Sequence, residues 1–318
     1  MPEENLTRRK ALQFIGATAL GTALTGTAAA NEHESPQGKL KFTYCLNMST
    51  IRGQNLGFMK ELEVAAAAGY RSVEIWMDSM QAWLDKGGTI KGIKTRLNDL
   101  GLKVEDCISF NKWIVDDSTI RQTGLEQMKK EMEMLAQLGC KRMAATGMGA
   151  TDADIPTLDV IAERYRSILD MGRSFGVAPQ IEMWGFLKNL QDVAEVLYVA
   201  MKSGRPSARV LLDVFHLYRG NTSLKTLSLM DPNAVEMFHM NDYPAGFPYQ
   251  TITDADRIYP GDGIAPIKQT LEILLRNRTT PLVLSCELFN KNYYRQDALT
   301  VAKTSLAKMK AIVEGLSY

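Results

Sequence analysis

The sequence predicts an α/β fold of the (β/α)₈ (TIM) barrel class, a single domain that follows an N-terminal signal peptide. Three observations predict this fold. Eight short β-rich runs alternate with longer segments of helical periodicity, glycines close several of the helical segments, and the 318-residue chain is long enough for a closed barrel, which typically takes about 250 residues.

Eight short apolar runs are expected to form the strands. Their near-continuous apolar character is typical of parallel strands that are covered on both faces. The segments between them are long enough for the crossover connections that parallel strands require. We expect strands at residues 41–46, 72–76, 103–110, 142–147, 179–184, 209–214, 235–240 and 282–288.

The segments between the strands are expected to be helices, because their apolar residues recur every three or four positions. The clearest are residues 56–70, 90–101, 124–139 and 157–176. Each ends at or beside a glycine that can take the left-handed conformation of a helix cap, namely Gly69, Gly101, Gly139 and Gly176. A doubly wound open sheet is the alternative fold, but the glycine-rich loop that such sheets often carry after the first strand is absent from residues 45–55.

The first 30 residues resemble a twin-arginine export signal. Arg8 and Arg9 precede a weakly apolar stretch, and residues 28–30 are alanines, which a signal peptidase accepts. A membrane anchor is the alternative, but the many Gly and Thr residues make a poor hydrocarbon span. We expect residues 1–30 to be a removed signal peptide, 31–39 a linker and 40–318 the barrel of an exported, periplasmic protein with no stable membrane span.

The composition excludes some classes of partner. Lys and Arg number 37 against 36 Asp and Glu, which leaves a formal net charge of +1 and no basic run for a phosphate backbone. We therefore expect no nucleic-acid partner. The four cysteines are far apart in mostly apolar runs, which favours buried reduced thiols.

Polar side chains end the last four expected strands. Glu182 ends the fifth, Asp213 and then His216 end the sixth, His239 ends the seventh and Glu287 ends the eighth. The carboxyl ends of barrel strands form the face on which such folds build active sites. A carboxylate in an apolar strand is costly to bury unless a positive group compensates it.

A divalent metal ion would compensate Glu182, Asp213 and Glu287 together, with His239 as a nitrogen ligand. Oxygen and imidazole ligands without thiolates suit Mn, Co, Mg or Zn in an open site, and argue against a closed structural zinc site. Each residue alone is better explained by an ordinary ion pair or a core hydrogen bond. Their coincidence on four successive strands favours one shared metal site.

The order Glu, Asp-x-x-His, His, Glu on the last four strands resembles the xylose isomerase-like superfamily of sugar isomerases and epimerases. This superfamily includes tagatose and psicose 3-epimerases, hydroxypyruvate isomerase and inosose dehydratase. The likeness covers essentially all of the chain after the signal, including "AAAAGYRSVEIW" at residues 65–76 and "DRIYPGDGIAP" at residues 256–266.

The resemblance implies roles for six positions. Glu182, Asp213, His239 and Glu287 would be the metal ligands, and Glu182 and Glu287 would also transfer protons to and from the substrate carbon. His216 and Arg257 would bind and orient the substrate. The implied substrate is a small carbohydrate. Whether the chain forms a homo-oligomer is left open by the sequence.

The chain departs from the family pattern at one point. The epimerases place a second glutamate six residues after the fifth-strand ligand, where this chain has Lys188, and this puts 3-epimerase specificity in doubt. A long insert at residues 243–255 separates His239 from Arg257 and could shape a pocket or cover the rim. Further pocket candidates, for which packing or surface charge is an equal explanation, are Glu74, Trp76, Lys112 and Trp113.

Three functions stay open. The first is a metal-dependent isomerase or epimerase acting through an enediolate of a free sugar or sugar derivative. The second is a metal-dependent lyase or dehydratase of keto-sugars such as 3-keto-glycosides, and the third is a barrel that binds sugar without catalysis. The endonucleases of the same fold use several histidines to hold three zinc ions, and the three histidines of this chain are too few.

Overall fold

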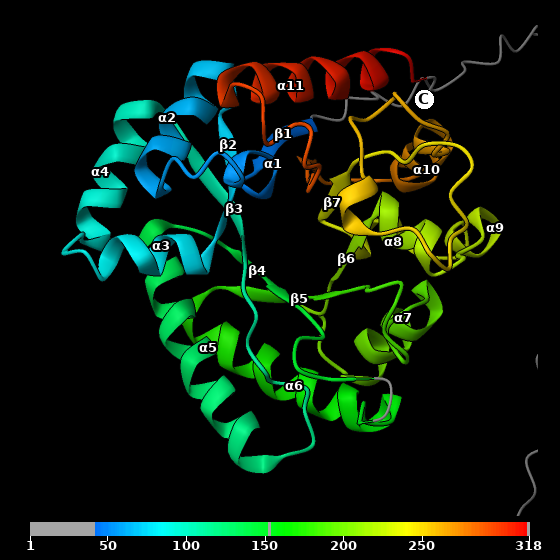
Figure 1. The fold of residues 1–318 in the computed structure, drawn as a ribbon. Helices are drawn as coiled ribbons and strands as arrows, with labels where there is room; N and C mark the ends of the chain where they lie inside the picture. The colour runs from blue at the N-terminus through cyan, green and yellow to red at the C-terminus, as the bar shows by residue number, and fades with distance from the viewer. Residues whose placement is uncertain (1–41, 152–153, 317–318) are drawn as a thin grey trace, which may run out of the picture. The chain divides into compact units, whose positions relative to one another are not determined.

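The computed structural model describes residues 42–151 and 154–316, so the predicted signal peptide and the predicted linker both lie outside the described residues. Eight parallel strands lie at the centre with helices around them (Figure 1). The strands are β1 (Phe42–Asn47), β2 (Ser72–Trp76), β3 (Lys103–Ile108), β4 (Arg142–Ala145), β5 (Ala178–Glu182), β6 (Val210–Asp213), β7 (Met237–Met240) and β8 (Leu282–Cys286). The predicted TIM-barrel class is confirmed.

The helices follow one another around the strands in chain order. The last, α11, lies beside α2 and β1, which brings the two ends of the described chain together (Figure 1). The helices are α1 (Ser49–Arg52), α2 (Phe58–Ala68), α3 (Met77–Leu84), α4 (Ile90–Leu100), α5 (Ser118–Leu138), α6 (Leu158–Phe175), α7 (Val193–Lys202), α8 (Val214–Arg219), α9 (Leu224–Leu227), α10 (Ile267–Leu275) and α11 (Ala298–Glu314).

The predicted helix caps are also confirmed. Gly69, Gly101, Gly139 and Gly176 end α2, α4, α5 and α6 with φ of 98°, 62°, 80° and 67°, in the left-handed region that favours glycine. In the described part of the chain, no helix is both long and apolar enough to cross a membrane. All four cysteines are buried and free.

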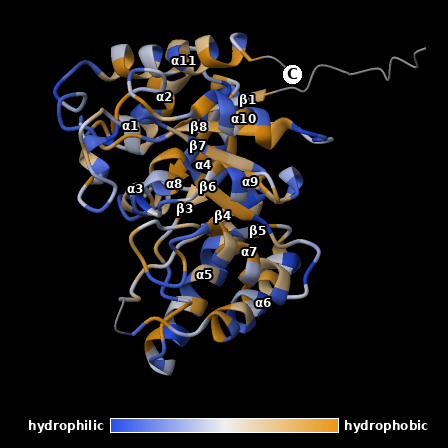
Figure 2. Ribbon diagram, turned by 90° about the vertical axis from the view of Figure 1, so that its right-hand side faces the viewer, coloured by the Kyte–Doolittle hydropathy of each residue, from blue (hydrophilic) through white to orange (hydrophobic). Residues whose placement is uncertain are grey.

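Hydropathy follows the layers of the barrel: the strands are mostly hydrophobic, and the helices carry both apolar and hydrophilic residues (Figure 2). Burial of the apolar strand residues between the barrel interior and the helix layer provides the main stabilisation of the fold. The last residues of β5 and β6, Glu182 and Asp213, are polar but still buried, and they mark the start of the site.

The barrel is hydrogen-bonded in the order β3-β2-β1-β8-β7-β6-β5-β4, so β3 and β4 are its two edge strands. They lie in contact, but no backbone ladder joins them in the described chain. Side chains bridge this seam instead. Arg142 of β4 donates to the Glu105 carboxylate of β3 at 3.0 Å, and Trp113 Nε1 donates to the Thr146 carbonyl at 2.8 Å.

Candidate active site

The last four strands place four predicted residues at one mouth of the barrel. Glu182 and Asp213 are the last residues of β5 and β6, His239 lies in β7 beside Asp213, and Glu287 directly follows β8. Parallel strands in register deliver these side chains to the same end of the sheet. All four side chains are buried, with 5%, 0%, 0% and 4% of their surface exposed.

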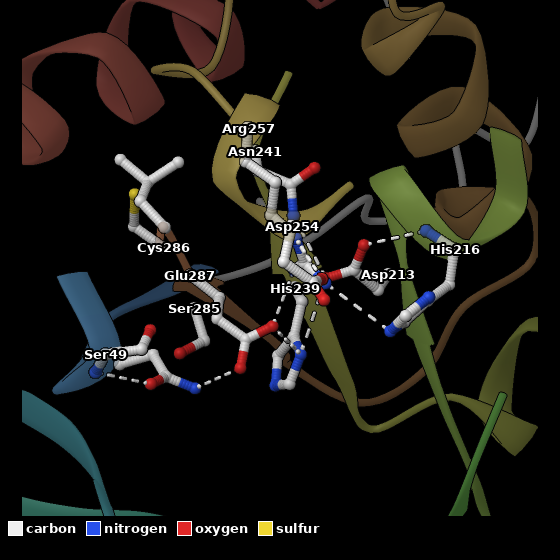
Figure 3. Close-up of polar contacts among 12 residues, drawn as sticks. Ser49, Asp213, His216, His239, Asn241, Asp254, Arg257, Ser285, Cys286 and Glu287 are labelled. Carbon is white, nitrogen blue, oxygen red and sulfur yellow. Dashed lines mark hydrogen bonds and ion pairs between the residues drawn. The ribbon is translucent and has the colours of Figure 1, made fainter. Parts of the chain in front are cut away.

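Three of the four predicted ligands converge. Asp213, His239 and Glu287 each offer an atom within 4.8 Å of the other two. His239 Nδ1 lies 3.1 Å from Glu287 Oε2 and 3.6 Å from Asp213 Oδ2, and Figure 3 shows the imidazole close to both carboxylates. Glu182 does not belong to this group of three, but it lines the cavity that opens beside it.

The other nitrogen of His239 is held by a glutamate from across the barrel. His239 Nε2 lies 2.9 Å from Glu74 Oε1, and Glu74 also accepts hydrogen bonds from Asn47 Nδ2 at 2.8 Å and Ser285 Oγ at 2.6 Å. A carboxylate in this position keeps the proton on Nε2 and directs the lone pair of Nδ1 outward, as behind metal-binding histidines.

The donor set fits a divalent cation. His239 Nδ1 is buried and forms no hydrogen bond of good geometry, although Glu287 Oε2 lies 3.1 Å away, and such a nitrogen is costly to bury unless something else binds it. Burial lowers the pKa of His239, but Glu74, Glu287 and Asp213 together raise it well above its usual value. The carboxylates thus favour positive charge at this nitrogen, and a cation would satisfy both requirements. Asp213, His239 and Glu287 would hold it, with Glu182 in reach of the same cavity.

Arg257 supplies the permanent positive charge of the mouth. Its Nη1 donates to Asp213 Oδ2 at 2.8 Å and to Glu287 Oε2 at 2.7 Å, and its Nη2 donates to Asp254 Oδ1 at 2.5 Å. The guanidinium is buried and lies over the Phe215 ring at 4.5 Å. Burial lowers its pKa, but the three carboxylates raise it above its usual value, so it stays charged.

His216 is neutral at pH 7. Burial lowers its pKa to about 4, although Asp213 acts in the opposite direction. The Gly185 N–H points at Nδ1 at 3.4 Å, and Arg257 Nη2, which can only donate, lies 3.4 Å from Nε2, so both ring nitrogens face donors. Both residues line the cavity, where they can contact a substrate oxygen.

Glu182 has a strongly shifted pKa. The net pKa is about 8. Burial raises it most, His239 lowers it, and Glu287 and Asp213 raise it. At neutral pH the carboxyl is therefore mostly protonated in the protein alone, and nearby positive charge would return it to the base form. A carboxyl poised near neutral pH is suited to proton transfer in either direction.

The cavity at the mouth has a volume of about 210 Å³. This is below the roughly 300–1,000 Å³ of drug-sized sites, so the occupant is small. The cavity combines one acidic and basic side with aromatic walls, and its lining residues are Trp76, Ile108, Phe110, Glu182, Trp184, Phe186, His216, Asp254, Arg257, Glu287 and Phe289.

The loop after β7 is built on one buried carboxylate. Asp242 accepts hydrogen bonds from the backbone N–H groups of Gly261 and Gly263 at 3.0 Å and of Ala265 at 2.9 Å. Gly263 has no room for a side chain, because a Cβ would come within 2.2 Å of the Tyr243 carbonyl oxygen. The loop that begins at Arg257 is thereby fixed against the end of β7.

The insert at residues 243–255 both helps to shape the cavity and covers part of the rim, the two possibilities that the sequence left open. Its first residue, Tyr243, is buried and stacks on Tyr218 of α8 with ring centroids 4.1 Å apart. Its last part contributes Asp254, which lines the cavity and pairs with Arg257. The insert therefore covers α8 and adds a carboxylate to the mouth.

Only some of the further pocket candidates lie at the active site. Trp76 lines the cavity, and Glu74 orients His239 from the barrel interior. Trp113 is fully buried core, and Lys112 lines a neighbouring cavity. Lys188 is exposed and does not line the cavity at the mouth.

Sequence reasoning missed three polar residues of the site. Asn47 donates to Glu287 at 3.1 Å and accepts from the Trp76 indole at 2.7 Å, and Asn241 donates to Asp213 at 3.0 Å. Asp254 is the third. Asn47 and Asn241 stand at the ends of β1 and β7, so the rule applied to the carboxylates would have found them. Asp254 begins a short 3-10 helix, Asp254–Asp256, away from the strand ends and carried no such signal.

A family model described as "Xylose isomerase-like TIM barrel" matches residues 62–312 of the chain. The chain is 25% identical over 280 residues to an inosose isomerase of Bacillus velezensis, which covers 85% of this chain and 96% of that protein. It is 24% identical over 276 residues to an inosose isomerase of Bacillus subtilis, with 81% and 94% covered.

Solved structures show the same fold. The IolI protein with a bound zinc atom superposes with a TM-score of 0.79 at 21% identity, covering 86% of this chain and 99% of that one. D-psicose 3-epimerase in the presence of D-fructose superposes with a TM-score of 0.67 at 17% identity, covering 86% and 100%.

Proposed function

The chain belongs to the xylose isomerase-like TIM barrel family, and from this premise we propose that it is a divalent-metal-dependent isomerase or epimerase of a small sugar or related polyol. The observation that carries the proposal is the convergence of Asp213, His239 Nδ1 and Glu287 beside a small cavity that Glu182 also lines. The relatives named inosose isomerase and the zinc-containing IolI structure support it.

The reaction begins when a carboxylate removes a proton from the carbon next to a carbonyl. Glu182 and Glu287 both line the cavity and are the two candidates for this step. A divalent cation held by Asp213, His239 and Glu287 would polarise the carbonyl and lower the pKa of the adjacent C–H. Return of the proton to the neighbouring carbon, with the hydroxyl proton passing from one oxygen to the other, gives an isomer, and return of the proton to the opposite face of the same carbon gives an epimer.

The negative charge that develops on the substrate oxygens must be stabilised. The Arg257 guanidinium is a charged donor in a buried cavity, where hydrogen bonds to developing charge are strongest, and His216 lies beside it with Nε2 3.4 Å from Nη2. Both are fixed before substrate binds, His216 by Gly185 and Arg257 by Asp254. This preorganisation reduces the entropy lost when the substrate is oriented.

Deuterium exchange tests the proposal. The protein, loaded with Mn, Co, Mg or Zn in turn, is incubated in D₂O with D-fructose, D-psicose and inosose, and the substrate is followed by NMR. We expect deuterium at the carbon beside the carbonyl with at least one metal and one substrate. Absence of exchange with all of them, from protein shown to contain metal, would contradict the proposal.

Elimination from a keto-sugar is the second candidate. One observation favours it: position 188, where the epimerases have a second glutamate, is an exposed lysine outside the cavity. A reaction that expels a leaving group needs only the first proton removal. Release of an alcohol or phenol from a 3-keto-glucoside, without any epimerised sugar, would identify this reaction.

A further inference from the structure

A second cavity lies next to the candidate active site. It has a volume of about 440 Å³ and lies between residues 110–112, after β3, and the first half of α5. Ile120, Thr123, Gly124 and Gln127 line it from the helix. None of the roles derived above uses this cavity.

The two cavities share a wall. The Phe110 side chain lines both, and its ring contacts Trp76, also in the wall of the active-site cavity, with centroids 5.3 Å apart. Phe110 is 37% exposed and Ile120 is 45% exposed. Large apolar side chains that stay exposed at the edge of a cavity are typical of a binding site.

The walls of the second cavity are fixed in place. Asn111 is buried and donates to Glu131 of α5 at 2.6 Å and to Ser109 at 2.8 Å. Gly124 lies directly against the backbone of Lys112, where a Cβ would come within 2.9 Å. The loop and the helix are therefore packed together without ligand, and a preformed site loses less entropy on binding.

We propose that this second cavity is a subsite for an apolar substituent of the substrate. The substrate is then a ring sugar or polyol that carries an aromatic or similarly flat apolar group, with its polar ring in the active-site cavity and its substituent across Phe110. The proposal rests on the proposed function, because it takes the position of the sugar ring from it. The Thr123 hydroxyl donates to the Thr119 carbonyl and Gln127 Nε2 donates to Glu131, so the side-chain oxygens of Thr123 and Gln127 would accept hydrogen bonds from polar groups on the substituent.

Matched pairs of glycosides test the subsite by binding alone. The probes are the α and β anomers of methyl and phenyl glucopyranoside, titrated by calorimetry into the full protein. We expect at least one phenyl glucoside to bind about tenfold more tightly than its methyl partner. A tenfold ratio corresponds to about 1.4 kcal/mol.

Two variants of adjacent residues on α5 localise the effect. Thr123→Arg puts a long charged side chain into the cavity, and Gln122→Arg adds the same charge at an exposed neighbour that does not line it. We expect Thr123→Arg to remove the advantage of phenyl over methyl and to leave methyl binding unchanged. Gln122→Arg should change neither value.

Each outcome decides the proposal. Equal binding of methyl and phenyl glucosides overturns the subsite and leaves the proposed function standing, and binding of none of the four probes counts against both. A phenyl advantage that survives Thr123→Arg also overturns the subsite. If Thr123→Arg instead lowers the mass of an oligomer measured by light scattering, the cavity is covered by a second copy of the chain and the subsite is wrong.

Discussion

The two ends of the barrel both carry charged side chains, but only one end has its charges balanced. At the amino ends of the strands, Arg142 bonds to Glu105 at 3.0 Å and to Glu236 at 2.9 Å, and Arg209 bonds to Glu236 at 2.9 Å. Lys103 adds a further contact to Glu105. Each carboxylate in this network has at least two cationic partners.

At the carboxyl ends of the strands, carboxylates outnumber cations. Asp213 and Glu287 share the single guanidinium of Arg257. Glu74 is paired with His239, and burial keeps Glu182 mostly protonated near neutral pH. The balanced end is suited to holding strands together, whereas the unbalanced end is suited to receiving a cation and moving protons.

The largest test of this contrast is Glu182→Gln. The amide keeps the shape of the side chain but cannot exchange a proton, so we expect the rate of deuterium exchange to fall by about 10²–10⁴. The unfolding midpoint and the metal content should be unchanged. Retention of full exchange in Glu182→Gln would show that another group transfers the proton, whereas a barrel that binds sugar without catalysis predicts no exchange in either protein and unchanged sugar binding.

The substitution Arg142→Leu removes a cation from the balanced end of the barrel. This change leaves Glu105, which is buried, with the exposed Lys103 as its cationic partner and the Ser72 hydroxyl as its hydrogen-bond donor, and we expect the free energy of unfolding to fall by about 3 kcal/mol. Urea denaturation measures this loss. The kcat of the folded variant should match the wild type, and a large fall in kcat would show that the two ends are coupled.

Glu61 of α2 is a buried carboxyl with no cation bonded to it, so its effect on the free energy of unfolding shows the cost of burying such a group. Burial raises its pKa from 4.5 to about 7, Arg52 lowers it, and its Oε2 has no hydrogen-bond partner. Because the folded-state pKa is the higher one, its contribution to stability is full below pH 4.5 and is lost as the pH rises through 7. Glu61→Gln should therefore gain about 3 kcal/mol at pH 8 relative to pH 4.

That gain would appear as a flatter dependence of unfolding free energy on pH, measured by urea denaturation from pH 4 to 8. An equal dependence in Glu61→Gln and wild type would contradict the prediction. Asp159→Asn is a suitable control, because Asp159 is exposed and its pKa is lowered, by Tyr198 first and then by Lys202.

The smallest expected effect is at Glu74. Glu74→Gln weakens the acceptor for His239 Nε2, and we expect the affinity for divalent metal to fall at least about tenfold. Calorimetric titration with Zn or Mn measures it. Glu105→Gln, at the balanced end, is the matched control and should leave metal affinity unchanged while it lowers stability.

The strands and the four mouth residues could be predicted because both follow from local pattern. Apolar runs locate the strands, and a polar residue at the end of a run, such as Asp213, is placed by the strand itself. All eight strands lie where expected, although several are shorter than their apolar runs. The run at 103–110, for example, ends as a strand at Ile108.

The partners of these residues could not be predicted in the same way. Glu74 reaches His239 across the barrel interior, between strands that are 165 residues apart and not neighbours in the sheet. Arg257 reaches Asp213 from a loop whose course depends on the contacts of Asp242. Such contacts depend on how the barrel closes and how its loops fold, which no short stretch of sequence encodes.

The seam between β3 and β4 makes one segment of the barrel easier to open than the rest. Elsewhere backbone hydrogen bonds join each strand to its neighbours. Across this seam, the described residues are joined instead by side chains such as Arg142 and Trp113. Breathing of the barrel should therefore start here, with the fastest hydrogen exchange of any strand amides. The loop that carries Phe110 continues from this edge and would move with it.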